Sequence, residues 1–96
     1  MPKSKQEIIA DIDGHISEGG GGYSAWYVGI SSNAKERLAE HKVKGWYIIR
    51  TATSSQVARE IEDHFVNSCR TDGGTGGGDE TATKVYAYKK APHTDP

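Results

Sequence analysis

The chain has 96 residues, of which 34% are hydrophobic, and a formal net charge of −1 at neutral pH. This length predicts a single domain with a modest core, and the charge lacks the basic excess that is usual for a dedicated tight binder of duplex DNA. The single cysteine, Cys69, cannot form an internal disulfide, which fits a reducing compartment. No stretch approaches the roughly 18 apolar residues that span a bilayer, and no apolar signal region opens the chain. We therefore expect a cytoplasmic protein without membrane contact.

Residues 4–17 are predicted to form the first helix. Ser4 and Glu7 have the spacing of a capping box. Because an apolar stripe at helical spacing is typical of core packing, we expect this helix to cover the core rather than to bind a partner. The glycines of 18–22 predict a turn after it. The stripe consists of Ile8, Ile9, Ile12 and Ile16.

Two strands with a short helix between them are predicted next. Residues 24–30 are aromatic and β-branched, as strands are, and 46–52 have the composition of a second, largely buried strand. Residues 34–42 are expected to form the helix between them. We interpret Trp26 and Trp46 as core residues rather than as platforms on which bases stack.

The longest later helix is predicted over 55–68. Its apolar stripe lies at intervals of four residues, and Glu60 and Glu62 flank Ile61 at about 100° to either side. Both glutamates therefore border the core stripe, and periodicity alone does not say which one enters a site. The stripe consists of Val57, Ile61 and Phe65, with Ala58 beside it.

The end of the chain combines a glycine-rich segment with a last strand. Residues 71–80 lack the Lys-Ser/Thr pair that follows a phosphate-binding P-loop, so we interpret them as a compact connection. Residues 84–90 alternate as a strand does, and 91–96 form a tail. The order of elements predicts one α+β domain over residues 1–96, with a small, mostly antiparallel three-stranded sheet flanked by three helices.

The side chains around the first strand and the short helix suit phosphodiester chemistry. Tyr27 lies in the strand, and Arg37 and His41 are four residues apart on one helical face. Hydrolysis needs an oriented water, compensation for the negative charge of the transition state, and a proton or a metal for the departing oxygen. One Mg²⁺ held by one carboxylate would suffice, because Mg²⁺ keeps most of its waters. Glu62 could supply that carboxylate.

These residues resemble the motifs of the GIY-YIG nuclease superfamily. Residues 27–29, Tyr-Val-Gly, are similar to the second half of the motif that names the family. The family has an arginine eight residues after this glycine, where Arg37 stands, and some members have a histidine one turn later, where His41 stands. An essential glutamate usually follows an alanine by four residues, as Glu62 follows Ala58. The resemblance therefore implies Glu62, and not the neighbouring glutamate, as the metal ligand.

The resemblance covers residues 24–67 and departs from the family in one respect. The first strand of the family, which carries the tyrosine used at the nucleophilic water, is absent from its usual place about ten residues before the second motif. The last strand could occupy the vacant sheet position and bring Tyr86 or Tyr88 to the site, with Tyr23 as a third candidate. Alternatively, the site is incomplete, and the protein binds nucleic acid without cutting it or does neither.

The resemblance implies a divergent endonuclease that hydrolyses DNA with one Mg²⁺ or Mn²⁺. Glu62 would hold the metal, and a late tyrosine would act with Tyr27 on the water. The alternative is a non-catalytic module that binds nucleic acid or protein on the same scaffold. Under either function, any sequence specificity would come from DNA shape or from a protein partner. We expect a monomer or a weak dimer. The residues expected to contact nucleic acid are Lys35, Arg37, Lys42 and Lys44.

Overall fold

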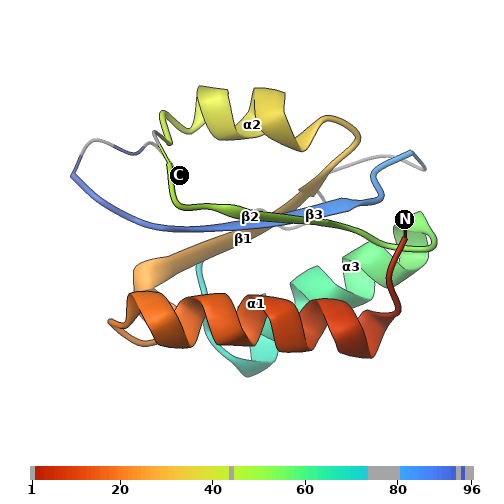
Figure 1. Ribbon diagram of the computed structural model, residues 1–96, viewed down its shortest axis with the longest axis horizontal. Coiled ribbons are helices and arrows are strands. Elements are labelled where there is room, and N and C mark those ends of the chain that lie inside the picture. Colours follow the sequence, from red (N-terminus) through yellow and green to blue (C-terminus); the bar gives the residue numbers. More distant parts are fainter. Residues whose placement is uncertain (1, 44, 74–80, 93, 95–96) are drawn as a thin grey trace.

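A computed structural model describes residues 2–43, 45–73, 81–92 and 94. Within these residues, three α-helices surround a three-stranded antiparallel sheet (Figure 1), which confirms the predicted fold class. The elements are α1 (Lys5–Gly19), β1 (Trp26–Ser31), α2 (Ala34–Glu40), β2 (Ile48–Thr51), α3 (Ser55–Asp63) and β3 (Lys84–Lys89). A 3₁₀ turn at Tyr23–Ala25 precedes β1, and a π-helical turn at His64–Ser68 follows α3.

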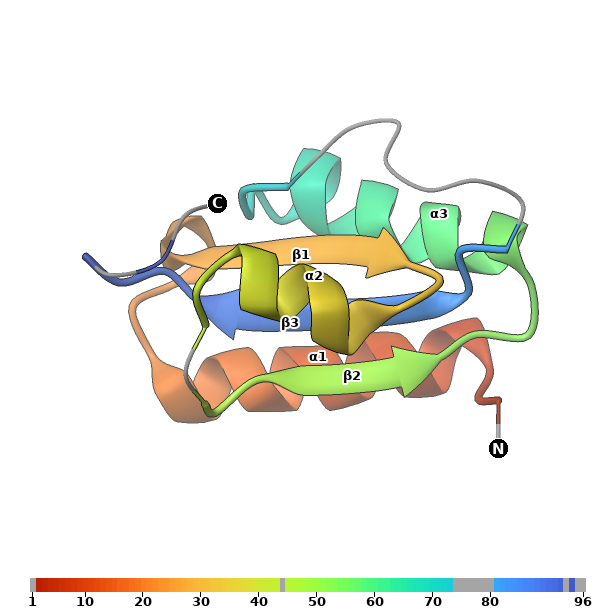
Figure 2. The same ribbon diagram turned by 90° about the horizontal axis from the view of Figure 1, so that it is seen from above.

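The last strand of the chain lies at the centre of the sheet. The strand order is β1-β3-β2, and β3 pairs antiparallel with both neighbours (Figure 2). In this register Tyr27 lies opposite Tyr88, and Gly29 lies opposite Tyr86. Of the alternatives that the sequence left open, the structure thus shows the one in which the last strand lies beside the first.

The helices form two layers of unequal size. α1 and α3 cover one face of the sheet, and α2 covers the other (Figure 1). Because successive strand residues point to opposite faces, Trp26, Val28 and Val85 enter the larger core with the isoleucines of α1, while the tyrosines of β1 and β3 face α2. In the described part of the chain, no helix has the length and apolar character needed to cross a membrane.

The ends of α1 follow from its sequence. Ser4 Oγ accepts a hydrogen bond from the Glu7 amide, and the Glu7 carboxylate accepts one from the Ser4 amide, so the predicted capping box is present. The helix runs two residues farther than predicted, to Gly19. It ends there because Gly20 adopts a positive φ of 74°, which glycine reaches at little cost, while its amide still donates to the Ile16 carbonyl.

The second predicted strand is shorter and more exposed than its sequence suggests. β2 covers four residues at the edge of the sheet, and only Ile48 of these is buried. The prediction of a largely buried strand over 46–52 is wrong because β3, and not β2, takes the central position. The core assignment holds for Trp26, which is fully buried, but fails for Trp46, which is 52% exposed.

The free edge of β1 is covered by the start of the glycine-rich segment. The Val28 amide donates to the Asp72 carbonyl, and the Asp72 amide donates to the Trp26 carbonyl, at 3.0 and 2.8 Å. Gly73 fits against this edge without room for a side chain, since a Cβ there would lie 2.7 Å from the Val28 carbonyl oxygen. The rest of the segment predicted as a connection, residues 74–80, lies outside the described residues, as does Lys44.

Candidate active site

Four aromatic side chains gather between the sheet and the C-terminal end of α2. The Tyr27 ring lies 4.7 Å from the ring of His41, 5.3 Å from that of Tyr88 and 6.3 Å from that of Tyr86, measured between centroids. The strand register explains the cluster, because Tyr27 and Tyr88 are direct cross-strand partners. His41 joins it from the C-cap of α2 and is itself buried.

The hydroxyl of Tyr86 reaches beyond this cluster because it passes over a glycine. Gly29 lies opposite Tyr86, and a Cβ at Gly29 would lie only 2.5 Å from the Tyr86 hydroxyl oxygen and 2.6 Å from Cζ. The missing side chain leaves room for the ring to extend across β1. The hydroxyl then lies 3.1 Å from His41 Nε2, within hydrogen-bonding distance.

We expect Gly29→Ala to disturb this arrangement selectively. The new methyl group would overlap a rigid ring held between β1 and α2, and overpacking of this kind typically costs about 1–3 kcal/mol. Chemical denaturation should register the loss of stability, and NMR of the His41 ring should register the loss of the Tyr86 hydrogen bond. Gly14→Ala is the matched control because a Cβ there meets nothing within 4 Å. An unchanged His41 spectrum in Gly29→Ala would contradict the packing described here.

Arg37 lies one turn before His41 and close to the same hydroxyl. A hydrogen bond with Tyr86 is the main reason that the pKa of Arg37 is raised, and the charge of Glu40 contributes to a smaller extent. The Arg37 side chain is 46% exposed, with Glu40 Oε1 at 3.8 Å. Such an ion pair at the surface is weak, so the guanidinium can also be reached by an anion from solvent.

Glu62 is the buried acid of α3. It is 8% exposed, whereas Glu60, two residues earlier, is exposed and lies 3.3 Å from Lys5 Nζ. The pKa of Glu62 is raised to about 7, mainly by burial and to a smaller extent by the neighbouring charge of Asp63. Among the described residues, Glu62 has no ion-pair partner. The structure therefore separates the two glutamates that helical periodicity could not.

Tyr86 connects the two layers electrostatically. α3 runs along the β1 side of the sheet (Figure 2), and the charge of Glu62 contributes to raising the pKa of Tyr86. Burial makes the largest contribution to the raised pKa of Tyr86. The Tyr27 side chain raises this pKa further and Arg37 lowers it, and the net value is about 12. The phenol is thus neutral at physiological pH, whereas the pKa of Glu62 is raised to about 7.

The sequence-predicted residues divide into three groups in the structure. Tyr27, Arg37 and His41 surround the Tyr86 hydroxyl, with Glu62 within electrostatic reach. Tyr88 is fully buried in the ring cluster and packs on Tyr27 and His41. The remaining basic residues, Lys35 and Lys42, are exposed on and after α2.

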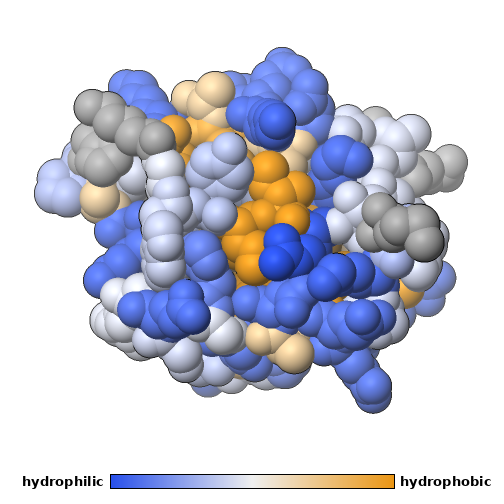
Figure 3. Space-filling model, in the orientation of Figure 1, coloured by the Kyte–Doolittle hydropathy of each residue, from blue (hydrophilic) through white to orange (hydrophobic). Residues whose placement is uncertain are grey.

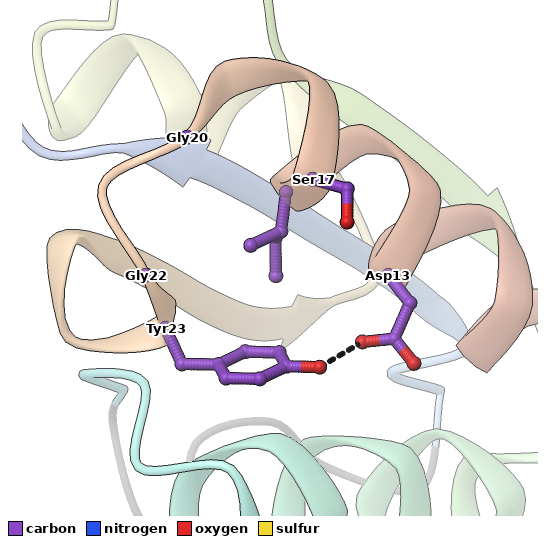
Figure 4. Close-up of a pocket in the computed structure, with 6 residues that line it drawn as sticks. Asp13, Ser17, Gly20, Gly22 and Tyr23 are labelled. Atoms are coloured by element: carbon purple, nitrogen blue, oxygen red, sulfur yellow. Dashed lines mark hydrogen bonds between the residues drawn. The ribbon is translucent and has the colours of Figure 1, made fainter.

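Tyr23, the third candidate for the missing tyrosine, lies elsewhere. Its hydroxyl donates to Asp13 Oδ1 of α1 at 2.7 Å, at the rim of a hollow of about 280 Å³ that is also lined by Ser17, Gly20 and Gly22 (Figure 4). A second hollow, of about 310 Å³, lies on the other flank of α1. Apart from Tyr23, the predicted site residues line neither of these two hollows, so the groups around Tyr86 are not part of either.

Gly29 is the residue whose role the sequence did not reveal. It belongs to the Tyr-Val-Gly motif, but nothing local indicates that it must make room for a ring 57 positions later in the chain. The only signal is its place in the register opposite Tyr86, which is defined once β3 pairs with β1.

A metal ion held by several protein ligands does not fit this site. No group of three or more His, Cys, Asp or Glu side chains in the described part of the chain could hold one. Glu62 is a single carboxylate without an ion-pair partner among the described residues, and Mg²⁺ can be held through a single carboxylate because it keeps most of its own waters. A scan against protein-family models, a search of curated proteins and a search of solved structures each find no match for this chain.

Proposed function

We propose that this protein is a metal-dependent endonuclease that hydrolyses DNA phosphodiester bonds. The observation that carries the proposal is the buried Glu62 carboxylate, which has no ion-pair partner among the described residues and a pKa of about 7, and whose charge acts on the Tyr86 phenol that Arg37 and His41 hold. Perturbed acids of this kind cluster at functional sites. Cys69 is a free cysteine, which agrees with action in the reducing cytoplasm.

Glu62 would hold one Mg²⁺ or Mn²⁺. A divalent cation would offset the electrostatic cost of keeping this carboxylate ionised in a buried position. When bound, the ion would supply Lewis-acid stabilisation of the phosphate oxygens. Water and substrate would supply the remaining ligands, as they do for Mg²⁺ bound by few protein groups.

The other residues have distinct parts in the proposed reaction. Arg37 offers a planar fork of donors to a phosphate and is accessible from solvent. Tyr86 orients water or the phosphate through its neutral hydroxyl, and His41, at 3.1 Å, is placed to accept or return a proton through that hydroxyl. Tyr27 packs against both His41 and Tyr88 and helps to hold these rings in place. We assign the place of the family's first tyrosine to Tyr86 rather than to Tyr88.

The second candidate is a module that binds nucleic acid without cutting it. The exposure of Lys35, Arg37 and Lys42 favours it, because surface cations can neutralise phosphates without any metal. Binding of that kind would be weak and would decline steeply with added salt.

A titration with divalent metal, followed by NMR, separates the two functions. If the protein is the proposed enzyme, Mg²⁺ should shift backbone amide signals centred on Glu62, and traces of Mn²⁺ should broaden the same signals. The amides around Glu18, an exposed acid at the end of α1, report on non-specific effects. If Mg²⁺ and Mn²⁺ leave the spectrum unchanged while DNA still shifts the signals of α2, the nuclease is wrong and the binding module is right.

A further inference from the structure

A tryptophan stands exposed two residues before β2. Trp46 is 52% exposed, and its neighbour Tyr47 is 40% exposed. Trp46 also has a φ of +52°, in the left-handed region that bulky residues rarely adopt. Such conformations persist only where the surroundings impose them, and they are concentrated at functional sites. An exposed aromatic residue in a costly backbone conformation calls for an explanation beyond packing.

The inner side of the Trp46 ring is held firmly. It stacks on the ring of His15 with centroids 4.0 Å apart and planes 22° apart, and His15 Nε2 donates to the Trp46 carbonyl oxygen at 3.2 Å. The buried Trp26 ring lies 5.9 Å away. Gly19 of α1 packs closely against the same ring, since a Cβ there would lie 2.7 Å from Trp46 Cζ3. The ring is thus fixed from behind while about half of its surface faces solvent.

Positive charge lies close to this platform. Lys89 Nζ donates to the Gly19 carbonyl at 3.1 Å, so that the ammonium and the Trp46 ring are neighbours of the same glycine. Lys89 is exposed, as is Lys42 four residues before Trp46. Glu18, also exposed, is the acid nearest in sequence to Gly19. A fixed aromatic face beside exposed lysine ammonium groups is the combination that binds a base together with its phosphate.

We propose that Trp46 is a stacking platform for an unpaired base of single-stranded DNA. The inference deepens the proposed function and rests on it for the choice of DNA, because it makes the substrate a DNA with an unpaired or displaced nucleotide. Duplex DNA offers no free base face, so Trp46 would distinguish single-stranded from fully paired substrates. An apolar peptide is a poorer match, because it would leave the lysine ammonium groups without a counter-charge.

Binding of a fluorescein-labelled dT₁₂ strand, followed by anisotropy in EDTA, tests this proposal without any cleavage. Trp46→Ala should weaken binding by about 5- to 150-fold, because one base–aromatic stack is worth roughly 1–3 kcal/mol. Trp46→Phe keeps a stacking face and should retain most of the affinity. Tyr23→Ala removes another exposed aromatic ring, on the opposite flank of α1, and should change little. Circular dichroism confirms that each variant is folded.

Three results would overturn the inference: no binding of dT₁₂ to the wild-type protein, equal binding by Trp46→Ala and the wild type, or an equal loss of duplex binding in Trp46→Ala. Quenching of the exposed Trp46 emission by dT₁₂ is a second measurement that needs no variant, and its absence would count equally against the proposal. These outcomes are independent of the nuclease. Metal-dependent cleavage with an unaffected Trp46→Ala keeps the enzyme and removes the platform, and the reverse pattern keeps the platform and removes the enzyme.

Discussion

Glu62→Gln should abolish metal-dependent DNA cleavage and, at pH 8, make the protein more stable. Glutamine has nearly the same shape but carries no charge, so it cannot hold a divalent ion by charge and it removes the cost of burying an ion. Loss of activity with a gain in stability is typical of a group kept for function. Cleavage of a labelled oligonucleotide in Mn²⁺ and urea denaturation measure the two effects.

The pH dependence of this gain follows from the proton affinity of Glu62. The folded protein holds the proton with a pKa of about 7, against an ordinary value of 4.5, so ionisation favours unfolding. The cost is absent below pH 4.5, grows as the pH rises to 7 and is complete above that. At 1.36 kcal/mol per pKa unit, it amounts to at most about 3 kcal/mol. Glu62→Gln should therefore stabilise the fold by roughly 1–3 kcal/mol at pH 8 and hardly at all at pH 4.5.

Glu60→Gln is the matched control on the same helix. Glu60 is exposed and paired with Lys5 at the surface, so its replacement should leave cleavage unchanged and alter stability by less than about 0.5 kcal/mol. If Glu62→Gln cuts DNA as well as the wild type, or if both variants lose activity to the same degree, the role assigned to Glu62 is wrong.

Tyr86→Phe should lower the rate of cleavage by at least about 100-fold while leaving the fold intact. The substitution removes only the hydroxyl, which lies 3.1 Å from His41 Nε2 and beside Arg37. Groups that position or transfer a proton in this way contribute on the order of 10²–10⁴ to the rate. Single-turnover cleavage measures the chemical step directly, and the melting temperature shows whether the variant is folded.

Tyr88→Phe provides the comparison that decides between the two late tyrosines. Tyr88 faces the same side of the sheet, but its ring packs in the buried cluster on Tyr27 and His41. We expect its replacement to keep cleavage within about threefold of the wild type. A large loss in Tyr88→Phe with little change in Tyr86→Phe would reverse the assignment.

Local patterns were sufficient for the elements themselves. The capping box and isoleucine spacing of α1, the stripe of α3 and the alternation of β3 each depend on residues a few positions apart, and each element formed where it was predicted. The π-helical turn after α3 falls within the predicted helix. The spacing of Arg37 and His41 likewise placed both near the Tyr86 hydroxyl, because residues four apart share a helical face.

Where two residues are equivalent by their local pattern, long-range packing decides which of them enters the candidate site. Glu60 and Glu62 border the same stripe, and only the docking of α3 against the sheet buries one and leaves the other in solvent. Tyr86 and Tyr88 are equivalent by alternation, yet the pairing of β3 with β1 sets one opposite Gly29 and the other opposite Tyr27. That pairing joins residues almost 60 positions apart, and no local pattern encodes it.

The same long-range pairing explains why the prediction of a largely buried strand over 46–52 is wrong. A strand that takes the centre of a three-stranded sheet leaves its neighbours at the edges, so the aromatic segment before β2 is not enclosed as its composition suggested. A side view of the surface shows apolar side chains reaching solvent between the two helical layers (Figure 3). The order of the elements and the chemistry of the candidate residues were thus determined by the sequence. Which of those residues meet was decided by the tertiary structure, because burial and cross-strand register are properties of the assembled sheet.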